Sequence, residues 1–95
     1  MEESEILKVK ANGKSPLKVV YQKEEGDHCW AIVLLEWCGN YRLGMRWFYS
    51  KVGLPQSSGR PVWFIIPDEL CITILNGLPL KPEDRKEIES YLSKR

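Results

Sequence analysis

The stretch IVLLEWCGNYRLGMRWFY, residues 32–49, decides the fold of this chain. Two runs rich in β-branched, leucine and aromatic residues flank Gly39 and Asn40, a pair that favours a tight hairpin turn because both residues tolerate positive φ. With these two as the turn residues, Cys38 is expected to face Tyr41 across the strands. The hairpin is therefore predicted to form the centre of an antiparallel sheet.

Side chains alternate between the two faces of a strand, so this register assigns every residue of the hairpin to one face. The predicted core face, almost wholly apolar, carries Ile32, Leu34, Glu36, Cys38, Tyr41, Leu43, Met45 and Trp47. The opposite face carries Ala31, Val33, Leu35, Trp37, Arg42, Gly44, Arg46 and Phe48.

The two arginines and two large rings on the second face suggest a ligand. Nucleic-acid bases stack on aromatic rings, at about 1–3 kcal/mol per base, and arginine pairs with phosphate in bidentate fashion. Aromatic residues and arginine also mark protein interfaces, so the same face could pack on a helix or a partner subunit. The pattern leaves both interpretations open.

Length and composition restrict the classes of function. A chain of 95 residues indicates one domain, whose small core would gain from dimerisation. A formal net charge of +1 gives no strong field toward nucleic acid or anionic membranes, so any anion site must be a local cluster. The apolar runs are too short to span a bilayer, and the acidic start lacks a secretory pattern. We therefore expect no membrane partner and a cytoplasmic location, nucleoid-associated or nuclear if the ligand is DNA.

Cysteine and histidine residues give no metal or catalytic signature. Cys29, Cys38 and Cys71 match no zinc spacing and are expected in or beside the core as small apolar residues. His28 adjoins Cys29, but neighbouring side chains on a strand point apart. Without paired carboxylates, a phosphate-binding glycine loop or a Cys-His-Asp arrangement, we expect no metal, no cofactor and no enzymatic activity.

The segments around the hairpin complete the predicted elements. Residues 1–15 are polar and lysine-rich and are expected to be a flexible N-terminal segment. Residues 16–22 favour a strand, residues 50–61 a polar loop, and residues 62–66 a buried strand.

Two helices are expected after these strands. Pro67-Asp68-Glu69 favours a helix start and Asn76-Gly77 its end, although the β-branched residues of 70–75 leave a strand open. A second helix is expected from Pro82, with an apolar stripe that includes Ile88 and Leu92.

Residues 32–70 resemble the single-stranded-DNA-binding domain of the positive cofactor four (transcriptional coactivator p15) family. Glu36-Trp37-Cys38-Gly39 is similar to the family's acid-aromatic-x-Gly turn, and residues 45–49 are similar to its apolar-Arg-x-aromatic-aromatic strand end. Gly59-Arg60 is similar to the Gly-Arg before its last strand, and Pro67-Asp68-Glu69 to its helix start. The resemblance covers under half of the chain and needs no gap.

The resemblance implies a homodimer with paired helices, whose curved sheets hold single strands without strong sequence preference. Trp37 and Tyr49 would correspond to the family's stacking rings, and Arg46 and Arg60 to its arginines. The family's lysine and glycine after the last arginine are replaced by Pro61-Val62, so one basic contact is missing. Tyr49 has the opposite parity to Trp37, which requires a bulge or bend, and the last helix is an addition.

We therefore expect an α+β fold: a strongly curved antiparallel sheet of about four strands and a helix in residues 16–79, then a C-terminal helix in residues 80–95. The predicted function is binding of single-stranded nucleic acid, DNA rather than RNA, in transcription or replication. Stacking is expected from Trp37, Phe48 and Tyr49, and phosphate contact from Arg42, Arg46, Lys51 and Arg60. The alternative is a protein–protein interaction module that uses the apolar edge at residues 62–66.

Overall fold

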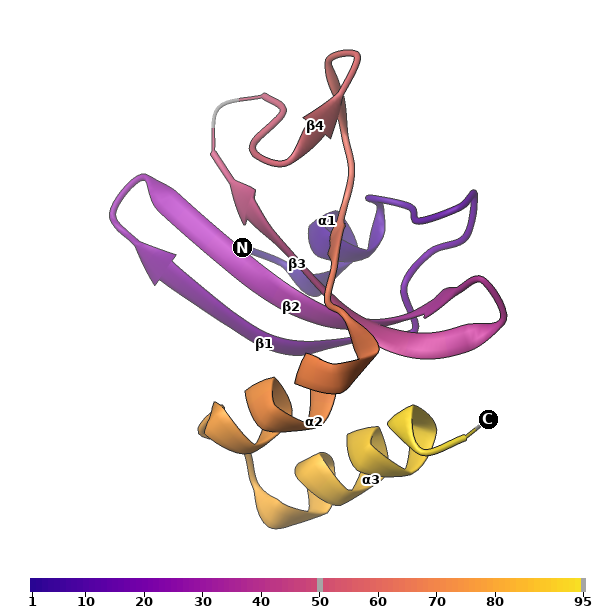
Figure 1. Ribbon diagram of the computed structural model, residues 1–95. Coiled ribbons are helices and arrows are strands. Elements are labelled where there is room, and N and C mark those ends of the chain that lie inside the picture. Colours follow the sequence, from indigo (N-terminus) through magenta and orange to yellow (C-terminus); the bar gives the residue numbers. More distant parts are fainter. Residues whose placement is uncertain (50, 95) are drawn as a thin grey trace.

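The computed structural model describes residues 1–49 and 51–94 and has an α+β fold. The elements in chain order are α1 (Glu3–Leu7), β1 (Lys18–Glu25), β2 (His28–Trp37), β3 (Asn40–Phe48), β4 (Gln56–Ser57), β5 (Arg60–Pro61), β6 (Phe64–Ile65), α2 (Asp68–Gly77) and α3 (Pro82–Leu92). The long strands curve along their length, with α2 and α3 on one side and α1 on the other (Figure 1). Among the described residues, no helix has the length and apolar character needed to cross a membrane.

The main sheet has the strand order β1-β2-β3-β6, and all its pairs are antiparallel. The short strands β4 and β5 form a separate hairpin within the segment that was predicted to be a polar loop. Ser50, the first residue of that predicted loop, and Arg95, at the end of the predicted C-terminal helix, lie outside the described residues. The predicted α+β class with about four antiparallel strands is confirmed.

The turn of the central hairpin differs from the prediction by one residue. Cys38 and Gly39 form the turn, and Trp37 pairs with Asn40. Both turn residues have positive φ, 50° and 83°, as a two-residue turn of the primed type requires. Each residue therefore meets a partner two positions from the predicted one, but the division into two faces is unchanged because side chains alternate with a period of two.

The predicted core face packs on α2 and α3. Cys71 and Leu75 of α2, and Ile88 and Leu92 of α3, are buried against it with i, i+4 spacing. This spacing matches the helical period. Residues 70–75 are therefore helical, and the alternative assignment of a strand is wrong.

The opposite face is covered rather than free. Ile6 of α1 is fully buried there beside Val33 and Leu35, and Ala11 and Trp63 complete the buried cluster. The N-terminal segment that the sequence predicts to be flexible contains α1 and docks on the sheet through Ile6. This face therefore packs on a helix, which is one of the two interpretations that the sequence pattern leaves open.

The apolar run at residues 62–66 forms less strand than predicted. Phe64 and Ile65 pair with β3, and the N–H of Ile66 donates to the carbonyl of Leu43. Trp63 and Ile66 are buried on opposite faces of the sheet, whereas Phe64 is 53% exposed. At the edge of the sheet, the run therefore contributes side chains to both faces, and the ring of Phe64 stays at the surface.

A matched pair of leucines on α2 tests this packing. Leu75 is fully buried and Leu70 is 49% exposed. We expect Leu75→Ala to lower the free energy of unfolding by about 2–5 kcal/mol, as for buried leucines elsewhere, and Leu70→Ala by about 0.5 kcal/mol or less. Urea unfolding followed by tryptophan fluorescence measures both, and equal losses would contradict the assigned orientation of the helix.

Candidate nucleic-acid interface

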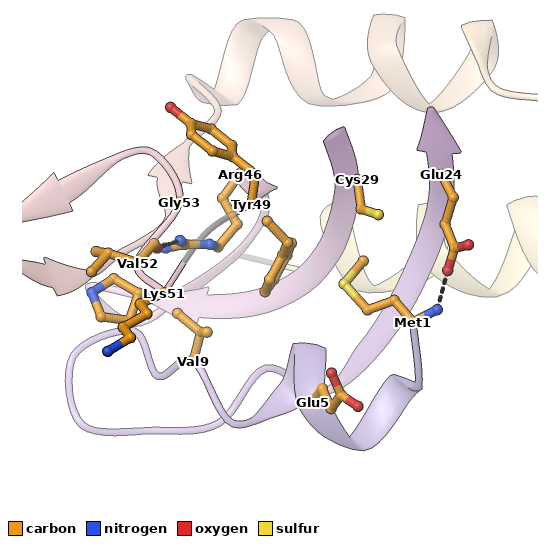
Figure 2. A pocket seen from close by; sticks show the side chains of 12 residues that line it. Met1, Glu5, Val9, Glu24, Cys29, Arg46, Tyr49, Lys51, Val52 and Gly53 are labelled. Atoms are coloured by element: carbon orange, nitrogen blue, oxygen red, sulfur yellow. Dashed lines mark hydrogen bonds and ion pairs between the residues drawn. The ribbon is translucent and has the colours of Figure 1, made fainter. Parts of the chain in front are cut away.

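Four of the seven predicted site residues line one cavity of about 480 Å³. They are Arg46, Phe48, Tyr49 and Lys51. The other lining residues come from the N-terminal segment, β1, β2, β5 and the segment after β3: Met1, Glu5, Val9, Glu24, Cys29, Val52, Gly53 and Pro61 (Figure 2). Small-molecule sites in proteins commonly measure about 300–1,000 Å³, so one nucleotide is a ligand of suitable size.

The remaining predicted residues lie elsewhere. Trp37 and Arg42 are half-buried near the turn at the other end of the hairpin. Arg60 is exposed on β5, next to Pro61 of the cavity wall. The structure therefore does not gather all seven residues into one site.

Arg46 is a buried structural residue rather than a free phosphate ligand. Its side chain is 2% exposed, and its guanidinium donates hydrogen bonds to the backbone carbonyls of Pro55 at 3.3 Å, of Val62 at 2.7 Å, and of Val52. The guanidinium also lies 4.9 Å from the ring centre of Phe48. Burial lowers the pKa of this guanidinium. The expectation that Arg46 pairs with phosphate at an open surface is therefore wrong, because its donors hold the segment after β3.

Gly53 lets this segment approach the sheet. Its φ is +69°, and a Cβ atom there would lie 2.2 Å from the carbonyl oxygen of Trp47 and 2.6 Å from Nη2 of Arg46. A side chain at this position would meet both backbone strain and a backbone clash. In Figure 2 the Arg46 side chain reaches toward Val52 and Gly53.

The charges at the cavity are mixed. Lys51 is exposed at its rim, and Glu5 and Glu24 lie in its wall. The carboxylate of Glu24 pairs with the terminal amine of Met1, which raises the pKa of that amine. The cavity therefore combines rings and one accessible cation with carboxylates.

The rings near the cavity are partly engaged with one another. Phe48 packs edge-on against Trp63, with ring centres 5.9 Å apart. Tyr49 packs edge-on against His28 at 5.3 Å, just beyond the end of β3. Both Phe48 and Tyr49 remain half-exposed, so part of each ring is accessible for stacking.

An apolar hollow of about 400 Å³, which the sequence analysis did not identify, lies beside the Trp47–Leu54 bridge. It is lined by Met45, Arg46, Trp47, Leu54, Pro55 and Phe64. Trp47, Leu54 and Phe64 are 38%, 43% and 53% exposed. The sequence shows that aromatic residues lie on this face. Whether they are exposed depends on how much of the face α2 and α3 cover, which the sequence does not show.

No grouping of three or more His, Cys, Asp or Glu side chains suited to a metal ion occurs within residues 1–49 and 51–94. His28 is exposed on the sheet, while Cys29 lines the cavity. Cys71 is buried as expected, whereas Cys38 is exposed in the turn.

The N-terminal wall of the cavity is a further feature that the sequence pattern does not predict. Met1, Glu5 and Val9 line it, and the carbonyl of Val9 accepts a hydrogen bond from Nε1 of Trp63 at 2.7 Å. The only available signal was the presence of Ile6 and other apolar residues among the lysines and glutamates.

Removing the Arg46 guanidinium tests its structural role. Arg46→Met keeps an unbranched apolar side chain but leaves the carbonyls of Val52 and Val62 without this donor, while the carbonyl of Pro55 keeps the N–H of Val62. Unsatisfied buried groups cost about 1–3 kcal/mol each, so we expect a loss of unfolding free energy of about 3 kcal/mol or more. The exposed Arg60→Met is the control, with a change of about 0.5 kcal/mol or less expected in urea unfolding. Equal losses of unfolding free energy in the two variants would contradict the structural role of the Arg46 guanidinium.

Comparisons of the chain with models of protein families, with curated proteins and with solved structures find no match.

Proposed function

We propose that this protein binds single-stranded nucleic acid with weak sequence preference. The observation that carries the proposal is the convergence of two accessible rings, Phe48 and Tyr49, with the ammonium of Lys51 at one cavity. A base enters beside the rings, and its phosphate meets Lys51. The resemblance of residues 32–70 to the positive cofactor four family supports the same function and favours DNA over RNA.

The other predicted residues extend the contact. Arg60 lies next to the cavity wall and supplies a second exposed cation. Trp37 and Arg42 lie farther along the hairpin and would contact more distant nucleotides. Arg46 positions the cavity wall from the inside. The proposal includes no catalysis and keeps the expected cytoplasmic location, nucleoid-associated or nuclear if the ligand is DNA, with a role in transcription or replication.

Fluorescence anisotropy with a labelled single-stranded oligonucleotide tests the proposal. Because each neutralised phosphate of a single strand contributes about 0.7 to the slope of log affinity against log salt, we expect Lys51→Ala to reduce that slope by about 0.7. We expect Tyr49→Ala to weaken binding about tenfold, which lies within the range of one lost stacking contact.

Lys81→Ala, which removes an exposed lysine before α3, is the matched control and should leave binding unchanged. Binding that does not respond to salt, or that falls equally in all three variants, would contradict the proposed site.

The exposed apolar hollow supports a second candidate, a protein–protein interaction module. Trp47, Leu54 and Phe64 present rings and aliphatic surface without an exposed charge between them. Exposed apolar clusters of this kind occur at protein interfaces. A homodimer, which the resemblance implies, would instead use the helices, where Leu70 and Ile72 are 49% and 36% exposed on α2.

Light scattering at rising protein concentration separates these interfaces. For a helix-paired dimer we expect a mass twice that of the 11.1-kDa chain, reduced to the monomer value by the double variant Leu70→Glu, Ile72→Glu. Phe64→Glu should leave that dimer intact. Dissociation by Phe64→Glu alone would place the contact at the hollow and favour the interaction module. A constant monomer mass would contradict the homodimer.

A further inference from the structure

Building on the proposed function, we infer that residues 1–14 act as an inhibitory strap over the single-strand-binding face. The strap comprises α1 and the segment up to the bridge between Ala11 and Lys14. It lies on the face of β2 and β3 that carries Trp37 and Phe48, two of the three predicted stacking residues. When the strap opens, that face becomes a longer platform for a single strand.

The strap interrupts a path between rings. Phe48 lies at one end of the hairpin and Trp37 at the other, and both are half-buried against the cluster that includes Ile6. Val33 and Leu35 lie along β2 between these ends and are buried together with Ile6 and Ala11 of the strap and with Trp63, which is not part of the strap. With the strap closed, a nucleotide can use the cavity but a longer strand cannot follow the sheet toward Trp37.

Besides the buried Ala11, the pair between the Met1 amine and Glu24 and the hydrogen bond from Nε1 of Trp63 to the carbonyl of Val9, few contacts hold the strap. Ile6 is its one fully buried side chain among the described residues, and α1 has five residues and no side-chain cap at its N-terminus. A helix so short has little stability of its own. Further on, Nζ of Lys14 pairs with Glu36 at 2.8 Å, but this pair is exposed and therefore weak. Segments with so few buried contacts open locally before the whole protein unfolds.

The strap also places negative charge at the cavity. Glu5 lines the cavity wall, where its carboxylate repels an entering phosphate. The strap's lysines, Lys8, Lys10 and Lys14, are exposed and do not line the cavity. The strap also brings the terminal amine of Met1 to the cavity, where this amine pairs with Glu24. The closed strap therefore opposes binding mainly by covering apolar surface, and the carboxylate of Glu5 adds a local repulsion.

A ligand-free measurement detects opening of the strap. Ile6→Ser removes its buried anchor, and Leu17→Ser, at an exposed position before β1 and outside the strap, is the matched control. The three cysteines report on separate regions: Cys29 in the cavity, Cys38 in the turn and Cys71 in the core. In Ile6→Ser we expect iodoacetamide to alkylate Cys29 about tenfold faster, with the rates of Cys38 and Cys71 unchanged.

Binding of labelled oligonucleotides of two and twelve nucleotides then tests inhibition. In Ile6→Ser we expect the affinity for the twelve-nucleotide strand to rise about tenfold and that for the dinucleotide to change little, because only the longer strand reaches the uncovered face. Glu5→Gln keeps the anchor and should tighten binding of both about twofold. The corresponding change on α3, Glu89→Gln, should have no effect.

Two results would overturn the strap while leaving the binding function in place. The first is equal acceleration of Cys29 and Cys71, which would make the N-terminal segment part of the cooperative core. The second is faster alkylation of Cys29 without tighter binding of the longer strand. If neither the unchanged protein nor Ile6→Ser binds either oligonucleotide at low salt, the proposed function itself fails, and the inhibitory role fails with it.

Discussion

The hydrogen bonds from the buried guanidinium of Arg46 to the carbonyls of Val52, Pro55 and Val62 hold the irregular half of this fold in place. Connecting segments normally run over the surface, because a buried one needs partners for its backbone groups. Here one side chain from the central strand supplies several donors to a segment with little regular pairing of its own. Arg46 also lines both the cavity and the apolar hollow on the two sides of the segment. Both candidate surfaces therefore depend on the same buried cation.

The hairpin illustrates what local sequence can establish. The predicted turn is displaced by one residue, and Cys38 lies in the turn instead of on the core face. The other side chains of the hairpin keep their predicted faces, because a partner shifted by two positions lies on the same face. The pattern could not identify what covers each face. An arginine among aromatic residues suggests a ligand site because arginine is seldom buried. Arg46 is buried because the chain after β3 brings the carbonyls of Val52, Pro55 and Val62 back to its guanidinium. This path of the chain is a property of the tertiary fold and not of the local sequence.

The other differences from the sequence predictions have the same origin. Residues 70–75 contain β-branched residues, but burial of Cys71 and Leu75 on one helical stripe outweighs this preference. The N-terminal segment looks solvated by composition, yet a single buried Ile6 docks it. The composition of a segment does not reveal that a single residue makes a buried contact. It therefore predicts strands and helices better than it predicts which segments cover them.

The burial of Arg46 also changes how the candidate site would attract an anion. The acceptors of its hydrogen bonds are neutral carbonyls, and none of the ion pairs within residues 1–49 and 51–94 involves it. Its positive charge is therefore not cancelled by a carboxylate in direct contact. Mobile ions screen a buried charge less than an exposed one such as that of Lys51. A phosphate at the cavity would feel both charges, but only direct contact with the accessible lysine releases counterions in the usual way. Arg46 can thus contribute attraction to the site without touching the ligand, while its hydrogen bonds keep the cavity wall in position.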